Sequence, residues 1–180
     1  MHAHRNLLTL ATLFAMSTIG TGAQAQEWPA KQPIKIVVPF AAGGTSDILA
    51  RTLGERLQVA LKQTVIIDNK AGGNGTIASE AVARSAPDGH TLMLGYIATH
   101  GMNPALQWYA IFAPANTPRP IVDKLNKTLN EVLADKGIVK RMQEHGADVQ
   151  TGTPEQLGAL VKSELVKWKR VVQAAELTTD

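Results

Sequence analysis

A chain of 180 residues is long enough for one ordinary domain or two small ones, and its 44% hydrophobic content is typical of a globular protein. Its 18 Lys and Arg residues, against 15 Asp and Glu, are dispersed without the clustered basic stretch that nucleic-acid binding usually requires, so we expect no nucleic-acid partner. The absence of cysteine excludes a disulfide framework and a thiol nucleophile.

The N-terminal stretch 1–25 is typical of a secretory signal. Basic residues and histidines precede an apolar run from Leu7 to Met16, and Ala23-Gln24-Ala25 offers small residues for cleavage before Gln26. The run is short for a membrane span, and no later stretch reaches about 18 apolar residues. We therefore predict export, with no membrane insertion after signal cleavage.

An apolar strand, a glycine pair and an amphipathic helix are predicted to follow one another from residue 34 onward. Ile34 to Val38 indicates a buried strand of the parallel type, and Gly43-Gly44 can take positive φ angles. Thr45 or Ser46 is expected to cap the helix. Backbone N–H groups at such a turn, together with the positive end of the helix dipole, suit a carboxylate or a phosphate. We predict a ligand site at this junction.

The same succession of strand, glycine-rich loop and helix recurs along the chain. Further strands are predicted at 64–67 and 91–94, and helices at about 46–61 and 76–85. Strands separated by helices favour an α/β layer with a mostly parallel sheet. Since ligands bind beyond the carboxyl ends of such strands, three candidate loops should lie on one edge: 39–47, 69–75 and 95–103.

The C-terminal part is predicted to add one strand at 108–113 and three helices. The helices are expected at about 120–135, 138–145 and 154–175, with a short strand at 148–151. Thr153, followed by Pro154 and Gln156, is a strong helix start. The last helix is expected to bury one face, made of Leu157, Leu160, Val161, Leu165, Trp168 and Val172.

Catalytic and cofactor motifs are sparse. No Walker A pattern, hydrolase elbow or metal-ligand spacing is present. Gly73-x-Gly75-x-x-Ala78 matches a relaxed dinucleotide pattern, although extra loop residues intervene after the strand. His90 is expected at the surface and His145 near a helix C-terminus. Asp47 has two interpretations: it complements the helix dipole, or it accepts hydrogen bonds from a ligand or an ordered water.

Four motifs occur in a fixed order along the chain. They are Pro39-Phe40-Ala41-Ala42-Gly43-Gly44-Thr45-Ser46-Asp47, Asn69-Lys70-Ala71-Gly72-Gly73-Asn74-Gly75, Ala86-Pro87-Asp88-Gly89-His90-Thr91-Leu92 and Trp108-Tyr109-Ala110-Ile111-Phe112-Ala113-Pro114. Together they closely resemble the tripartite tricarboxylate transporter receptor family, the Bug-type extracytoplasmic solute receptors. The resemblance covers essentially all of the chain after the signal.

Members of that family are type II periplasmic binding proteins, in which two α/β lobes close on a small carboxylated solute. The resemblance implies a receptor that is not an enzyme and holds no cofactor or metal. Its implied partners are a small carboxylate and the membrane subunits of a tripartite transporter. The first loop is implied to contact the ligand carboxylate through its backbone and ordered waters. The candidate ligand-binding residues are Phe40, Ala42, Gly43, Gly44, Thr45, Ser46, Asp47, Thr99 and His100.

The chain departs from the family at one point. In family members a long segment with most of the second lobe separates the Asn-Pro-Ala-Leu motif from the Trp-Tyr strand, whereas here only Gln107 stands between Leu106 and Trp108. We interpret this as an in-frame internal deletion near 107, so that 26–106 and 108–180 together form a single lobe. Because one lobe supplies half a cleft, we expect weak or absent ligand binding.

Two other functions stay open. One is a small dinucleotide-dependent enzyme that uses Gly73 to Ala78. The other is an exported interaction module or nonfunctional remnant, whose surviving lobe folds but takes no small ligand. Cofactor binding would favour the first, and intact folding without carboxylate binding would favour the second.

Overall fold

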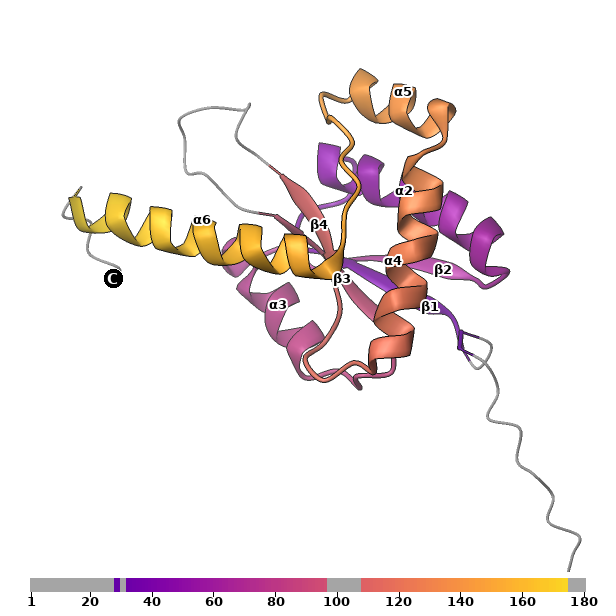
Figure 1. Cartoon of the computed structure of the whole chain (residues 1–180), viewed down its shortest axis with the longest axis horizontal. Helices are drawn as coiled ribbons and strands as arrows, with labels where there is room; N and C mark the ends of the chain where they lie inside the picture. Colours follow the sequence, from indigo (N-terminus) through magenta and orange to yellow (C-terminus); the bar gives the residue numbers. More distant parts are fainter. Residues whose placement is uncertain (1–27, 30–31, 97–107, 175–180) are drawn as a thin grey trace, which may run out of the picture.

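The computed structural model describes residues 28–29, 32–96 and 108–174, apart from the side chains of 168, 171, 172 and 174 (Figure 1). The predicted signal at 1–25 and the predicted join at 107 lie outside these residues. A four-stranded sheet in the order β2-β1-β3-β4 forms the centre. The strands are β1 (Ile34–Val38), β2 (Val65–Asn69), β3 (Thr91–Tyr96) and β4 (Tyr109–Phe112). β1 pairs in parallel with both β2 and β3, and β4 runs antiparallel to β3. The predicted α/β class with a mostly parallel sheet is confirmed.

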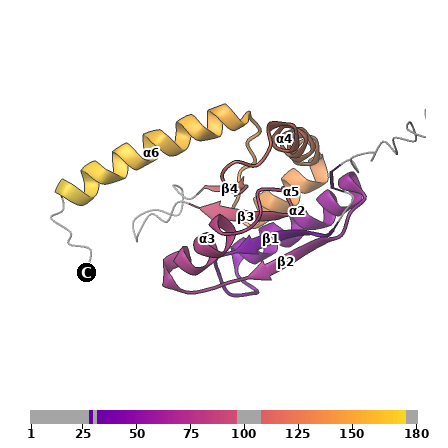
Figure 2. The ribbon, with the colours of Figure 1, turned by 90° about the horizontal axis from the view of Figure 1, so that it is seen from below.

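Helices cover both faces of this sheet. The helices are α2 (Thr45–Leu61), α3 (Thr76–Ala83), α4 (Arg119–Leu133), α5 (Lys136–Glu144) and α6 (Pro154–Ala174), and a short 3-10 turn, η1 (Gly73–Gly75), precedes α3. Side chains from β1, β3, α2, α4 and α5 form the main core, while α3 packs on the opposite face (Figure 2). The predicted amphipathic character of α2 is confirmed, since Leu49, Leu53 and Leu57 are buried on one face.

Three parallel strands place their carboxyl ends on one edge of the sheet. β1 leads into α2, β2 leads through η1 into α3, and β3 ends at Tyr96. The crossover from each strand to the next parallel strand is made by a helix, as parallel pairing requires. The predicted loops 39–47 and 69–75 therefore lie at one edge, which confirms that expectation for these two. Of the third predicted loop, 95–103, the structure describes only 95–96, which are the end of β3.

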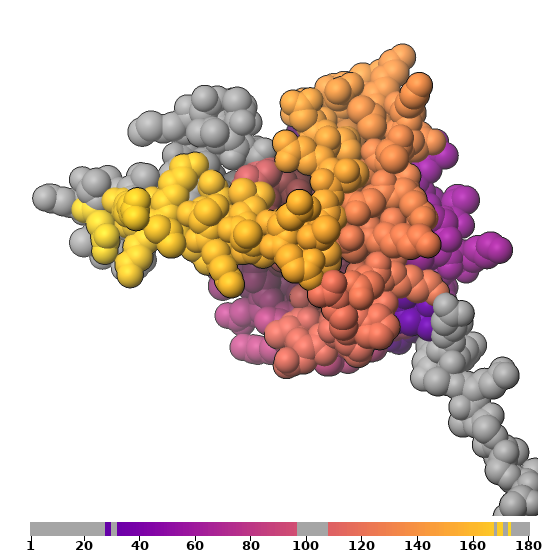
Figure 3. Space-filling view, in the orientation of Figure 1, coloured from indigo at the N-terminus to yellow at the C-terminus, as the bar shows by residue number. Residues whose placement is uncertain are grey.

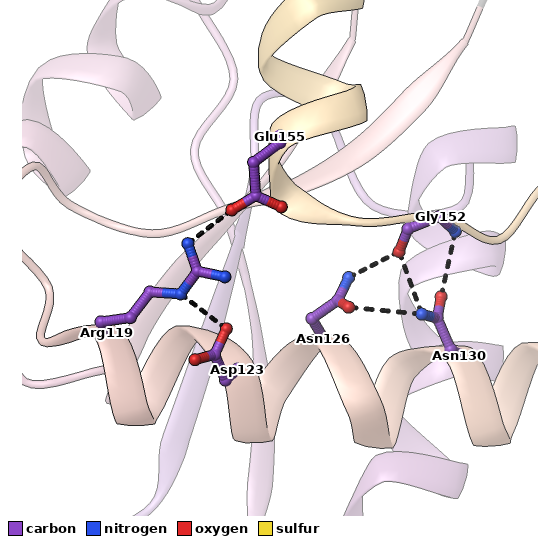
Figure 4. Close-up of polar contacts among 6 residues, drawn as sticks. All are labelled: Arg119, Asp123, Asn126, Asn130, Gly152 and Glu155. Carbon is purple, nitrogen blue, oxygen red and sulfur yellow. Dashed lines mark hydrogen bonds and ion pairs between the residues drawn. The ribbon is translucent and has the colours of Figure 1, made fainter.

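The last helix, α6, is anchored at its start. The Gly152 carbonyl accepts hydrogen bonds from Asn126 and Asn130 at 2.9 and 3.0 Å, and Arg119 pairs with Glu155 (Figure 4). Thr153 Oγ1 also accepts the Gln156 N–H at 3.2 Å, while Gln156 Oε1 accepts the Thr153 N–H at 2.8 Å. This reciprocal pair is the predicted helix start, which is confirmed.

The predicted burial of one α6 face is wrong for at least two of its residues. Leu160 is 41% exposed and Leu165 is 64% exposed. Among the described elements α6 packs against α4, and beyond its first turns it extends away from the body (Figure 3). Periodicity therefore predicted the apolar face correctly but not its exposure. The side chains of Trp168 and Val172 lie outside the described set.

Two smaller expectations are also wrong. Residues 148–151 form no strand, because this stretch runs as irregular chain between α5 and α6. His90 is 6% exposed rather than at the surface, because the Asp88 carboxylate accepts its backbone N–H and its ring lies 6.0 Å from that of Trp28. His145 is the C-cap residue of α5, so its predicted position near a helix C-terminus is confirmed, and it is exposed.

No described helix is long and apolar enough to cross a membrane.

Candidate ligand-binding site

The loop between β1 and α2 is closed by backbone and side-chain contacts of its own residues. Gly43 has a φ of 89°, a left-handed conformation that glycine adopts without strain. Gly44 is the N-cap residue, and no side chain caps the helix there, so the predicted cap by Thr45 or Ser46 is wrong. Both residues already belong to α2. The carboxylate of Asp47 instead accepts the Gly43 N–H at 2.9 Å.

Asp47 is a buried acid within this structure. It is 3% exposed, and its Oδ2 accepts a second hydrogen bond, from Arg51 Nε at 2.9 Å. The hydrogen bond from Arg51 and that from Gly43 hold the pKa of Asp47 below its ordinary value, although burial opposes this shift. The other oxygen, Oδ1, is buried without a hydrogen-bond partner in the described part of the chain. Asp47 therefore supports the loop from within.

The loops that follow β1 and β2 meet the end of β3. Asn69 Nδ2 donates to the Phe40 carbonyl at 3.1 Å, which joins the first loop to the end of β2. The rings of Phe40 and Tyr96 lie 4.4 Å apart. At Gly75, with a φ of 87°, an added Cβ would lie 3.3 Å from Pro39 Cβ. The sheet edge is thus one continuous surface.

Tyr109 on β4 is a site neighbour that the sequence did not indicate. The Ser46 hydroxyl donates to the Tyr109 hydroxyl at 3.4 Å, so β4 reaches the N-terminus of α2. A hollow of about 310 Å³ opens beside this edge. Its lining residues are Asn74, Gly75, Ser79, Met93, Gly95, Tyr96 and Phe112.

The predicted ligand-binding residues divide by their exposure. Ala42, Gly43, Gly44 and Thr45 are exposed, Phe40 is half-buried, and Ser46 and Asp47 are buried. Thr99 and His100 lie outside the described residues. The structure therefore brings seven of the nine predicted residues into one short loop and helix start, and their contact with a ligand stays a prediction.

The remaining chemistry of this edge is limited. Among the described residues, no group of three or more His, Asp or Glu side chains is arranged to hold a metal ion. The Gly73–Gly75 segment forms a 3-10 turn, and Lys70 to Gly75 separate β2 from α3. A dinucleotide site requires its first glycine in a tight turn directly after the strand. The loop after β2 therefore lacks that geometry.

Comparison with known proteins gives one family and several relatives. The family model described as tripartite tricarboxylate transporter family receptor matches residues 49–106 and 97–177. A UPF0065 protein of Bordetella bronchiseptica is 49% identical over 89 residues, which are 49% of this chain and 26% of that protein. BugT of Bordetella pertussis is 40% identical over 94 residues, 52% of this chain and 28% of BugT. The matched stretches thus span about a quarter of these relatives.

Solved structures share the fold. The periplasmic binding protein BugD superimposes with a TM-score of 0.76 at 22% identity, covering 83% of this chain and 99% of that chain. A Rhodopseudomonas palustris protein solved with bound malate, MatC, gives a TM-score of 0.68 at 20% identity, covering 79% and 99%. An R. palustris protein solved with adipate gives a TM-score of 0.73 at 18% identity, and the match covers 83% of this chain and 99% of that protein's chain. These likenesses confirm the predicted periplasmic binding-protein fold.

Proposed function

We propose that this chain, which belongs to the tripartite tricarboxylate transporter receptor family, binds the carboxylate of a small organic acid at the loop between β1 and α2. The observation that carries this proposal is the loop itself. Exposed Gly43, Gly44 and Thr45 lie where α2 begins, and their conformation is fixed by the hydrogen bond from Gly43 to Asp47.

A helix start of this kind suits a carboxylate for two reasons. The first N–H groups of an α-helix have no acceptor within the helix, and α2 begins at Thr45. The aligned peptide dipoles add a partial positive charge at the same end. The glycine residues leave the backbone open to a close approach by ligand oxygens. The family and the malate and adipate bound by two structural neighbours support an organic acid as the ligand.

We further propose that the described elements form one lobe of a receptor, with most of a second lobe deleted near residue 107. The family model matches this chain as two segments, 49–106 and 97–177, that overlap at 97–106. The matched stretches cover about a quarter of the two Bordetella relatives. A ligand held on one lobe stays in contact with water, which weakens its polar contacts. We therefore expect dissociation constants near the millimolar range.

The proposed setting is the periplasm, where the chain would hand its solute to the membrane subunits of a tripartite transporter. The family and the periplasmic binding proteins of the same fold support this setting. Because family members are receptors, we propose no catalytic step for the carboxylate and no role for a dinucleotide. The single lobe is expected to hand over solute poorly, since closure around the ligand needs two lobes.

Isothermal titration calorimetry with malate and adipate tests the proposed ligand class. We expect weak heats that fit a dissociation constant of about 1 mM or more. A micromolar dissociation constant would contradict the half-cleft, and the absence of any binding heat at tens of millimolar ligand would contradict the ligand class. A thermal shift with NAD and flavin cofactors, expected to be absent, separates the receptor from the dinucleotide enzyme.

A further inference from the structure

We propose that Arg51 is a positioning residue for the ligand loop, acting through Asp47 and Asn69 rather than by touching the ligand. This inference rests on the proposed carboxylate function of that loop. Arg51 lies in the second turn of α2, and its guanidinium donates to Asp47 Oδ2 at 2.9 Å through Nε and to Asn69 Oδ1 at 3.4 Å through Nη2. One side chain thus joins the helix start to the end of β2.

Arg51 closes a circuit of hydrogen bonds around the turn. Asp47 holds the N–H of Gly43, and Asn69 holds the carbonyl of Phe40. These hydrogen bonds therefore fix the positions of both ends of the turn from Phe40 to Gly43. The N–H groups proposed to receive the ligand carboxylate belong to the residues just beyond this turn, so the shape of the turn would set their direction.

The guanidinium also offsets a charge that opposes the proposed function. Asp47 is a buried carboxylate placed directly beneath a loop proposed to receive an anion. Like charges separated by a few ångströms in a poorly solvated site repel each other strongly. Arg51 lies 2.9 Å from the Asp47 carboxylate and is itself half exposed. Its charge lowers the repulsion that an incoming carboxylate meets.

Neighbouring cations are engaged elsewhere. Lys70 pairs with Asp68 at 3.5 Å, and Lys35 lies 3.9 Å from the same carboxylate. Asp47, by contrast, forms its ion pair with Arg51. The guanidinium is suited to this place because its planar fork reaches two acceptors at once, which an ammonium group cannot do in the same way.

Four variants separate positioning from general stability. Arg51→Met removes the charge and both donors, and Arg51→Lys keeps the charge but loses the fork. The pair of changes Asp47→Asn and Arg51→Met removes both charges together. The matched control is Arg84→Met, because Arg84 forms the same i,i+4 pair with Glu80 on α3, at 3.1 Å and away from the loop.

The readouts are the Gly43 amide proton shift, the Asp47 titration midpoint by NMR, and malate affinity. In Arg51→Met we expect a shifted Gly43 resonance, a higher Asp47 midpoint and malate binding weakened by about tenfold, a 1.4 kcal/mol change. Arg51→Lys should lose less affinity than Arg51→Met. The double variant should regain part of it, because the unpaired buried charge is gone, and Arg84→Met should match the unaltered chain.

Two results would overturn the inference. One is an Arg51→Met chain with an unchanged Gly43 resonance and unchanged malate affinity. The other is a double variant that binds malate no better than Arg51→Met, which would exclude charge compensation. If the unaltered chain binds no malate, the proposed ligand class fails, yet the Gly43 shift and the Asp47 midpoint still decide whether Arg51 positions the loop. Should Arg51→Met fail to fold, Arg51→Lys supplies the same readouts.

Discussion

The Ser46 hydroxyl donates a hydrogen bond to the Tyr109 hydroxyl at 3.4 Å, although the two residues are 63 positions apart. Ser46 lies in the first turn of α2 and Tyr109 opens β4, so the contact joins the proposed ligand loop to the strand beyond Gln107. The parts of the chain on either side of that point therefore share one sheet and meet at the start of α2.

This contact predicts a measurable coupling between the two side chains. Ser46→Ala and Tyr109→Phe each remove one hydroxyl, and we expect each to lower the free energy of unfolding by about 0.5–1 kcal/mol. The double variant should lose less unfolding free energy than the two single variants lose together, with a coupling energy of about 0.5 kcal/mol. Urea unfolding of all four chains measures this cycle. Strict additivity would show that the hydroxyl contact contributes nothing.

The glycine pair predicts an asymmetry. Gly43 has a φ of 89°, whereas Gly44 has a φ of -81° that any residue can adopt. No atom lies within 4 Å of a Cβ added at Gly43, so Gly43→Ala suffers from backbone strain alone. We expect Gly43→Ala to cost about 1–2 kcal/mol of unfolding free energy and Gly44→Ala, its matched control, to cost far less. Equal losses would contradict the assigned loop conformation.

The lowered pKa of Asp47 predicts a specific dependence of stability on pH. Because the hydrogen bond from Arg51 lowers the folded-state pKa below the ordinary value of 3.8, Asp47 contributes stability above that pH. The contribution is lost as pH falls from about 4 through the folded-state pKa. Asp47→Asn should therefore flatten the acid limb of the stability curve. Urea midpoints across the acid range check this, and parallel curves for both chains would refute it.

The exposure of α6 predicts tolerance to charge. Leu165 is 64% exposed, so Leu165→Glu should change the free energy of unfolding by about 0.5 kcal/mol or less. Leu57 is 1% exposed in the core, and Leu57→Ala should cost about 2–5 kcal/mol. Urea unfolding compares the two. If Leu165→Glu lowered the free energy of unfolding as much as Leu57→Ala, the exposed face of α6 would have to be covered in solution.

The sequence predicted those features that depend on neighbouring residues. The alternation of strands and glycine loops, the amphipathic helix after the glycine pair and the cap at Thr153 each follow from local patterns, and each was confirmed. The Ser/Thr cap at the ligand loop was wrong because Gly44 takes the N-cap position one residue earlier. Local composition does not distinguish these two registers.

Features that depend on distant parts of the chain were not predictable in the same way. Tyr109 reaches Ser46 only because β4 pairs with β3, and a strand pattern does not say which neighbour it will take. The apolar face of α6 was predicted from its period, but periodicity cannot show whether another element covers it. His90 looked like a turn residue, and its burial against Trp28 arises from contacts across the fold.

An amide chemical-shift titration with adipate tests the central proposal most directly. We expect shifts concentrated at Gly43, Gly44, Thr45 and Ser46, in fast exchange, with a dissociation constant of about 1 mM or more. Such a pattern would place an organic acid at the start of α2, bound weakly by one lobe of the cleft. Shifts confined to other parts of the chain, or tight micromolar binding, would contradict the account of a receptor that retains one lobe of its cleft.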